Sequence, residues 1–258
     1  MASETLRLKL LVAYDGRPFC GWQSQATKDA VQDHLEAAFA EIVGSRVVVQ
    51  GSGRTDAGVH ALGQIAHADV PRDRVPLAKW AGALNALLPC EIRVMSATRA
   101  RADFHARFDA CGKVYIYRIW NGPALHPIEI GRAWHVPIPL NLATMRECAA
   151  LLEGTHDFAG FAANRRRPER GTVRTIHSIR IACRGELLTL RFEGGGFLYK
   201  MVRLMTGTLV RCGQARLDAA FIRELLDKPG LKKTNYSAPA EGLYLMRVLY
   251  PRRTTARR

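Results

Sequence analysis

The sequence has no long hydrophobic run. Hydrophobic residues make up 48% of its 258 residues, yet no stretch of about 18 consecutive apolar residues occurs, so we expect no membrane-spanning helix. The first residues also lack the basic segment followed by an apolar segment that a secretory signal needs. Both absences lead us to expect a cytoplasmic protein with no membrane partner.

Cysteine pairs are also missing. The six cysteines form no Cys-x-x-Cys pair, and none has a histidine at the spacing of a metal site; they lie at positions 20, 90, 111, 148, 183 and 212. Such paired spacings are typical of zinc sites and redox motifs. We therefore predict reduced, mostly buried thiols, as is usual in the cytosol, and no metal.

Acidic residues are scarce in the second half of the chain. Residues 105–258 carry 12 Asp and Glu against 26 Lys and Arg, whereas residues 1–104 carry 11 against 12. Of the 38 basic residues 30 are arginine, which binds phosphate in a bidentate manner. This asymmetry favours a polyanionic partner, most commonly nucleic acid. The alternative is an arginine-rich genome, whose composition gives the same charge without a function.

The first half shows a regular alternation of strand and helix patterns. Apolar residues recur at helical spacing over two segments, 31–42 and 77–87, and β-rich runs cover four others, namely 6–14, 46–50, 64–70 and 92–97. The resulting order is βαββαβ, the split ferredoxin-like arrangement.

The second half repeats this order in part. We expect strands at 113–120, 175–183, 186–192 and 243–249, and helices at 142–152, 198–210 and 217–226. No sequence repeat supports a duplication, so the prediction depends on element order alone. It is an α+β fold with two RRM-like domains, 1–104 and 105–258.

One segment concentrates chemistry on a single carboxylate. Gly-Arg-Thr-Asp-Ala-Gly-Val-His-Ala, residues 53–61, places Asp56 between Arg54 and Gly58, in a glycine-rich loop between two expected strands. Glycines permit positive φ angles and close approach of a ligand, and loops on a rigid scaffold often present reactive side chains. The alternative is an ordinary hairpin turn in which Arg54 and Asp56 form a surface ion pair.

This motif resembles the active-site motif of the tRNA pseudouridine synthase A (TruA) family. Five further segments resemble that family in the same order, so that the resemblance covers nearly the whole chain; they are residues 14–25, 103–108, 113–117, 197–203 and 240–245. The resemblance implies an isomerase that needs no cofactor and converts uridine to pseudouridine in the tRNA anticodon stem-loop, at positions 38, 39 and 40. It also implies a homodimer whose subunits each join two sheets around a central active-site cleft.

The resemblance assigns roles to individual residues. Asp56 is the expected catalytic nucleophile, and Tyr115 is expected to stack on the uracil. Arg54 is expected to hold the nucleotide, and Arg203 to pair with the catalytic carboxylate. Leu243 is expected to line the base pocket. Without the resemblance, Tyr115 and Leu243 would be ordinary core residues and Arg203 an exposed helix charge.

Further residues are expected to contact RNA: His60 and His105 beside the motifs, and the loop arginines Arg165, Arg166 and Arg167. That loop could equally be a solvated loop without a ligand. Two other functions stay open, a synthase of the same fold that modifies other RNA uridines, and a non-catalytic RNA-binding protein. The second lacks support from the expected strands, because none carries the aromatic-glycine signature of RRM domains.

Overall fold

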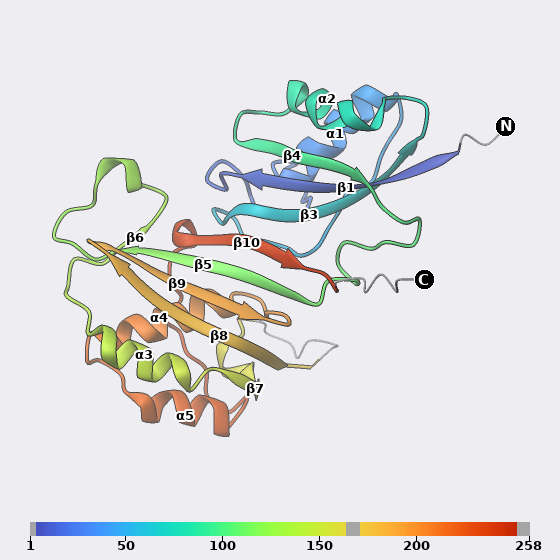
Figure 1. Cartoon of the computed structure of the whole chain (residues 1–258). Coiled ribbons are helices and arrows are strands. Elements are labelled where there is room, and N and C mark those ends of the chain that lie inside the picture. Colours follow the sequence, from blue (N-terminus) through green and yellow to red (C-terminus); the bar gives the residue numbers. More distant parts are fainter. Residues whose placement is uncertain (1–3, 164–170, 252–258) are drawn as a thin grey trace, which may run out of the picture. The chain divides into compact units, whose positions relative to one another are not determined.

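The computed structural model describes residues 4–163 and 171–251, which fall into two compact units (Figure 1). The first unit comprises Met1–Cys111 and Leu245–Arg258, and the second comprises Gly112–Tyr244. The sequence had placed the boundary near residue 104 and the closing strand in the second domain. By its contacts, most of that strand instead belongs to the first unit.

The first unit has the expected βαββαβ order. Its elements are β1 (Thr5–Tyr14), α1 (Val31–Val43), β2 (Gln50–Gly51), β3 (His60–Pro71), α2 (Trp80–Leu87) and β4 (Ile92–Arg99), with a 3-10 turn at Leu77–Lys79 before α2. Strand β1 pairs antiparallel with both β3 and β4, and β2 pairs antiparallel with β3. The order β4-β1-β3-β2 is that of a split ferredoxin-like sheet. Beside β3 lies the part of β10 (Leu243–Leu249) that belongs to this unit.

Alternation along β1 builds the core of this unit. Leu8, Leu10 and Val12 are fully buried, because successive side chains of a strand point to opposite faces. The rings of Phe39 on α1 and Trp80 on α2 pack with their centroids 5.6 Å apart. The sequence pattern therefore identified the buried faces of β1 and α1, whereas Leu77 and Leu87, at the ends of the second helical stretch, are exposed.

The strand expected at 46–50 is almost absent. Only Gln50–Gly51 pair with β3. The backbone N–H of Val49 instead donates to the Glu36 carboxylate of α1, at 3.0 Å. Val47 and Val49 are still buried, so the β-rich composition reflects packing of an extended segment rather than sheet pairing.

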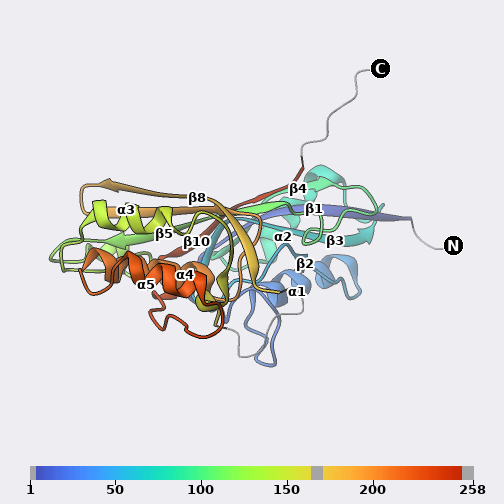
Figure 2. The same ribbon diagram turned by 90° about the horizontal axis from the view of Figure 1, so that it is seen from below.

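The described part of the second unit contains a mixed sheet with three helices. Its strands are β5 (Gly112–Trp120), β6 (Trp134–His135), β7 (Gly154–Asp157), β8 (Val173–Arg184) and β9 (Leu187–Gly194). They pair antiparallel in the order β5-β9-β8-β7, while β6 pairs parallel with β5. The helices are α3 (Leu142–Ala150), α4 (Met201–Gly213) and α5 (Ala219–Asp227), with 3-10 turns at Pro127–Glu129, Phe158–Phe161 and Ala240–Gly242. Helix α3 packs against α4 and β8, and Figure 2 gives a second view of these helices beside their strands.

The cysteines are less buried than the sequence analysis predicted. All six are free thiols, but only Cys148 and Cys212 are buried. Cys90, Cys111 and Cys183 are exposed, because they lie outside the helix positions that face the core. Among the described residues, no helix combines the length and the apolar character that crossing a membrane requires.

Candidate active site

Asp56 lies on the loop of residues 52–59, between β2 and β3. Hydrogen bonds to β3 hold the start of this loop, because Gln64 accepts from the Ser52 hydroxyl at 2.6 Å and donates to the Gly53 carbonyl at 2.9 Å. Its end closes with a turn in which the Val59 N–H donates to the Asp56 carbonyl at 3.1 Å. The Asp56 side chain is half-buried. A carboxylate on so firmly held a loop can act in covalent or acid–base chemistry.

Thr55, the residue before Asp56, is held by hydrogen bonds from β1 and from the segment that follows β1. The hydroxyls of Thr55 and Tyr14 share a buried hydrogen bond of 2.8 Å. The Thr55 carbonyl accepts from the Trp22 N–H at 3.1 Å. Burial raises the pKa of Tyr14 well above its ordinary value, despite hydrogen bonds that lower it, so this phenol stays protonated. These contacts fix the backbone from which Asp56 projects.

Gly21 permits the close approach of this segment to the loop. Its φ angle is +105°, and a Cβ atom there would lie 2.5 Å from the Thr55 carbonyl oxygen. Both the backbone angle and the contact exclude a larger residue.

His60 links the loop to residues 15–17. It is 3% exposed, and its Nδ1 accepts the Gly16 N–H at 3.1 Å and lies 3.3 Å from an Asp15 carboxylate oxygen. Asp15 also accepts from Arg17, at 2.6 Å. Burial works to raise the pKa of Asp15, but the hydrogen bonds and charge of Arg17, together with the charge of His60, hold it below its ordinary value. The Arg54 side chain, in contrast, is exposed.

In the second unit, Tyr115 lies on β5 in register with Phe192 of β9. It is 8% exposed, and its ring meets that of Phe197 edge to face, with centroids 5.1 Å apart and planes at 82°. Edge-to-face contacts of this kind fix the orientation of a ring. Tyr115 is thus an oriented aromatic side chain with a small exposed fraction.

In the same unit, Arg203 bonds to the segment that precedes Leu243 in the sequence. The Arg203 Nε atom on α4 donates to the Ala238 carbonyl at 2.8 Å, and the Ala238 N–H donates to the Arg203 carbonyl at 3.0 Å. The Tyr117 hydroxyl on β5 donates to the next carbonyl, that of Pro239, at 2.7 Å. After the 3-10 turn Ala240–Gly242, Leu243 is the first residue of β10 and is 7% exposed.

Sequence reasoning missed several residues that position these groups. Tyr117 has a detectable signal, because it lies two positions after Tyr115 and therefore on the same strand face. Burial raises the pKa of Tyr117 well above its ordinary value, and the positive charge of Arg203 opposes that shift. Tyr14 and Gly21 lie in the segment 14–25 that resembles the family, but no local pattern shows that they act on Thr55, which is more than thirty positions away in the sequence.

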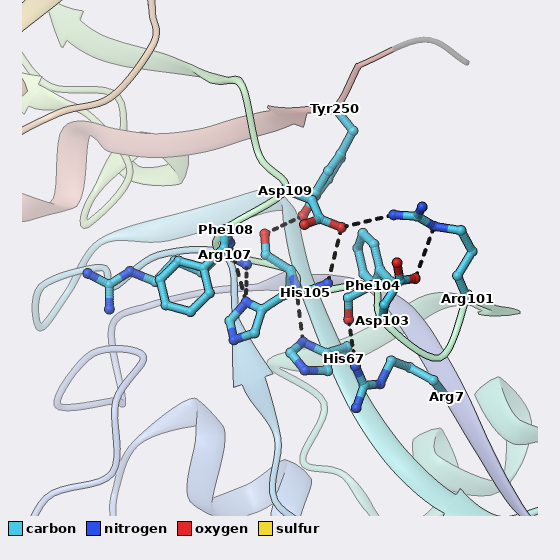
Figure 3. Close-up of polar contacts among 11 residues, drawn as sticks. Arg7, His67, Arg101, Asp103, Phe104, His105, Arg107, Phe108, Asp109 and Tyr250 are labelled. Carbon is cyan, nitrogen blue, oxygen red and sulfur yellow. Dashed lines mark hydrogen bonds and ion pairs between the residues drawn. The ribbon is translucent and has the colours of Figure 1, made fainter. Parts of the chain in front are cut away.

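His105 lies on a separate turn of the first unit, beside His67 of β3 (Figure 3). The two imidazole rings meet edge to face with centroids 4.7 Å apart. His105 is partly exposed. The predicted contacts of Arg165, Arg166 and Arg167 lie outside the described residues.

A half-buried carboxylate on a glycine-rich loop held by hydrogen bonds, within an α+β unit, is an arrangement that enzymes use for nucleophilic or acid–base chemistry. The chain belongs to the tRNA pseudouridine synthase family, whose sequence model matches residues 10–109 and 148–251. Membership makes it an isomerase.

Curated relatives match nearly the whole chain. A protein of Akkermansia muciniphila named tRNA pseudouridine synthase A is 45% identical over 255 residues, covering 96% of each chain. Proteins of that name from Geobacillus kaustophilus and Geobacter sulfurreducens are 42% and 41% identical, covering 95% and 94% of this chain and 95% and 99% of their own. Among solved structures, a Cbf5-Nop10-Gar1 complex has 14% identity and a TM-score of 0.36, over 92% of this chain and 48% of that chain.

Proposed function

We propose that this chain isomerises uridine to pseudouridine in the anticodon stem-loop of tRNA, at positions 38, 39 and 40. The observation that carries the proposal is the motif at residues 53–61, which is held as a rigid loop and lies inside the region that the family model matches. The choice of stem-loop and positions is supported by the resemblance of six segments in family order.

The reaction needs one carboxylate and a pocket for the base. The N1–C1′ glycosidic bond breaks, the uracil turns, and a bond forms between C5 and C1′. The proton on C5 is lost and N1 gains one, so the atoms balance without a co-reactant. We assign Asp56 as the nucleophile that acts at the ribose. The target uridine must first leave its helical stack, as bases do in other enzymes that modify them.

Residues of both units receive substrate-binding roles in this proposal. Arg54 is exposed and can contact a phosphate. Tyr115 offers an oriented ring for stacking on the uracil. Arg203 is the cation for the catalytic carboxylate, and Leu243 contributes an apolar wall. Of the two histidines assigned to RNA, His105 is the more accessible, because His60 is buried.

The proposal includes a cytoplasmic homodimer that needs no cofactor. Light scattering of the purified protein, with and without tRNA, measures the subunit number directly. A monomer in both states would remove the dimer from the proposal and leave the isomerase assignment unchanged.

The decisive experiment replaces Asp56 by Asn. The amide keeps the shape of the side chain but cannot act as a nucleophile. We therefore expect Asp56→Asn to abolish pseudouridine formation while tRNA binding stays within a few-fold of wild type. Because the reaction is mass-neutral, the product is read by pseudouridine-specific chemical labelling followed by primer extension.

Asp73→Asn is the matched control, since this exposed acid lies in the turn after β3, away from the loop. Substantial turnover by Asp56→Asn, with the Asn verified in the purified protein, would overturn the assigned mechanism. Labels at other uridines would favour a synthase of the same fold with a different target. Binding by the wild type without any label would favour the non-catalytic RNA-binding protein.

A further inference from the structure

The turn at residues 103–109 presents an aromatic ring that is more than half exposed. Phe108 is 58% exposed, and its ring lies on that of His105, with centroids 4.1 Å apart and planes tilted by 33°. The Arg107 guanidinium lies 5.8 Å from the Phe108 ring centroid, within cation–π range. Figure 3 shows Arg107 and Phe108 on one side of the turn, away from Arg101 and Asp103.

Hydrogen bonds from other parts of the first unit hold the backbone of this turn. The Phe104 carbonyl accepts from Arg7 at 3.0 Å, the Ala106 N–H donates to His67 Nδ1 at 3.2 Å, and the Ala106 carbonyl accepts from the Tyr250 hydroxyl at 2.6 Å. These partners come from β1, from β3 and from the residue after β10. The turn is therefore held at Phe104 and at Ala106.

The His105 ring is held as well. Its Nδ1 atom accepts the N–H groups of Arg107 and Phe108 at 3.1 and 3.3 Å. The His105 N–H donates to the Asp109 carboxylate at 3.2 Å. In the neutral ring the proton therefore lies on Nε2. An imidazole held in this way, with the Phe108 ring packed on it, makes a platform that costs little entropy to use.

An exposed aromatic ring next to an arginine matches the chemistry of an unpaired nucleotide. Bases stack on aromatic side chains whatever their sequence, and a neighbouring arginine binds the phosphate. We infer that His105 and Phe108 form a stacking platform for an unpaired base of the RNA substrate, and that Arg107 contacts the phosphate of that nucleotide. The inference rests on the proposed function, since it takes tRNA as the substrate.

The platform is separate from the reacting uridine. The turn packs on β3 at His67, whereas the Asp56 loop ends where β3 begins, at His60. A strand rises about 3.3 Å per residue, so these two points lie about 20 Å apart. The nucleotide on the platform is therefore not the one that Asp56 attacks. Loss of the platform should weaken tRNA binding and raise KM, while the single-turnover rate at saturating tRNA stays unchanged.

The test is a substitution series at Phe108, with an unmodified tRNA transcript as the probe. Phe108→Ala and Phe108→Leu should each weaken tRNA binding about 5- to 150-fold, the factor that corresponds to one lost base–aromatic stack, whereas Phe108→Trp should bind as wild type does. Met95→Ala is the matched control, because Met95 is 60% exposed on β4 of the same unit. Melting temperatures establish that each variant is folded.

The salt dependence of tRNA binding separates the role of Arg107 from that of Phe108. Arg107→Ala should reduce the slope of log Kd against log salt by somewhat under one unit, since one phosphate contact is lost. Phe108→Ala should leave that slope unchanged.

Three results would overturn the inference. The first is wild-type affinity in Phe108→Ala, and the second is equal affinity of the Leu and Trp variants. The third is a change in subunit number without a change in tRNA affinity, which would make the ring a protein contact. The proposed function fails separately, if the wild type forms no pseudouridine while the affinity series behaves as expected.

Discussion

At the scale of a single residue, the buried side chain of His67 makes the stability of the first unit depend on pH. It is 4% exposed, and its Nδ1 accepts the Ala106 N–H. Burial, followed by the positive charges of His105 and Arg7, lowers the pKa of His67 to about 4, against the opposing effect of nearby carboxylates. The folded protein therefore keeps this ring neutral where an unfolded chain would protonate it.

The sign of the pH dependence follows from this shift. Well above pH 6.5 both states hold His67 neutral, so it contributes no slope there. As pH falls from about 6.5 to about 4, the unfolded state binds the proton first, so the free energy of unfolding decreases. We expect His67→Gln, which can still accept the Ala106 N–H but cannot titrate, to flatten this decrease.

The measurement is denaturant unfolding at pH 7, 5.5 and 4. His177→Gln is the control, because His177 is an exposed histidine on β8. An equal loss of stability in wild type and His67→Gln would show that His67 does not carry the expected pH dependence.

At the scale of elements, the segment between β1 and α1 supports the Asp56 loop through a glycine that nothing larger can replace. Gly21→Ala would place a Cβ 2.5 Å from the Thr55 carbonyl oxygen at a φ of +105°. At Gly44, which ends α1 with a φ of +79°, a Cβ would meet no atom within 4 Å. A comparison of alanine variants at these two glycines thus separates the effect of backbone strain from that of a steric clash.

We expect Gly44→Ala to cost about 1–2 kcal/mol of unfolding free energy from strain alone, with normal turnover. Gly21→Ala should cost more and lower the turnover rate, because Thr55 and Asp56 must move. Chemical denaturation gives the first quantity and pseudouridine labelling the second. Equal costs together with normal turnover in both variants would contradict the supporting role of Gly21.

At the scale of the whole molecule, the charge asymmetry predicts salt-dependent binding. Residues 105–258 carry 26 Lys and Arg against 12 Asp and Glu, and each phosphate contact adds somewhat under one unit to the slope of log K against log salt. Neutralising Arg165, Arg166 and Arg167 together should flatten that slope by roughly two units if each makes one contact. Fluorescence anisotropy with labelled tRNA measures it. An unchanged slope would assign this loop to solvent and the RNA path to other basic residues.

Local pattern was enough to predict the order of elements in the first unit. The spacing of Val31, Leu35 and Phe39 predicted the buried face of α1, and alternation along β1 predicted its buried positions. Periodicity follows directly from helix and strand geometry, so it can be read without knowledge of the fold. The glycine-rich motif around Asp56 was equally visible.

Tertiary structure decided the contacts between distant segments. Tyr14 reaches Thr55 across 41 positions, Glu36 takes the Val49 N–H that a strand would have used, and His67 holds the turn at Ala106. The first of these contacts joins two side-chain hydroxyls, and the other two satisfy backbone N–H groups. The contacts of the folded chain also assign most of the closing strand to the first unit. Which distant segments meet is a property of the folded chain, so the sequence by itself determined most of the elements and the position of the motif around Asp56, and the fold determined what holds them in place.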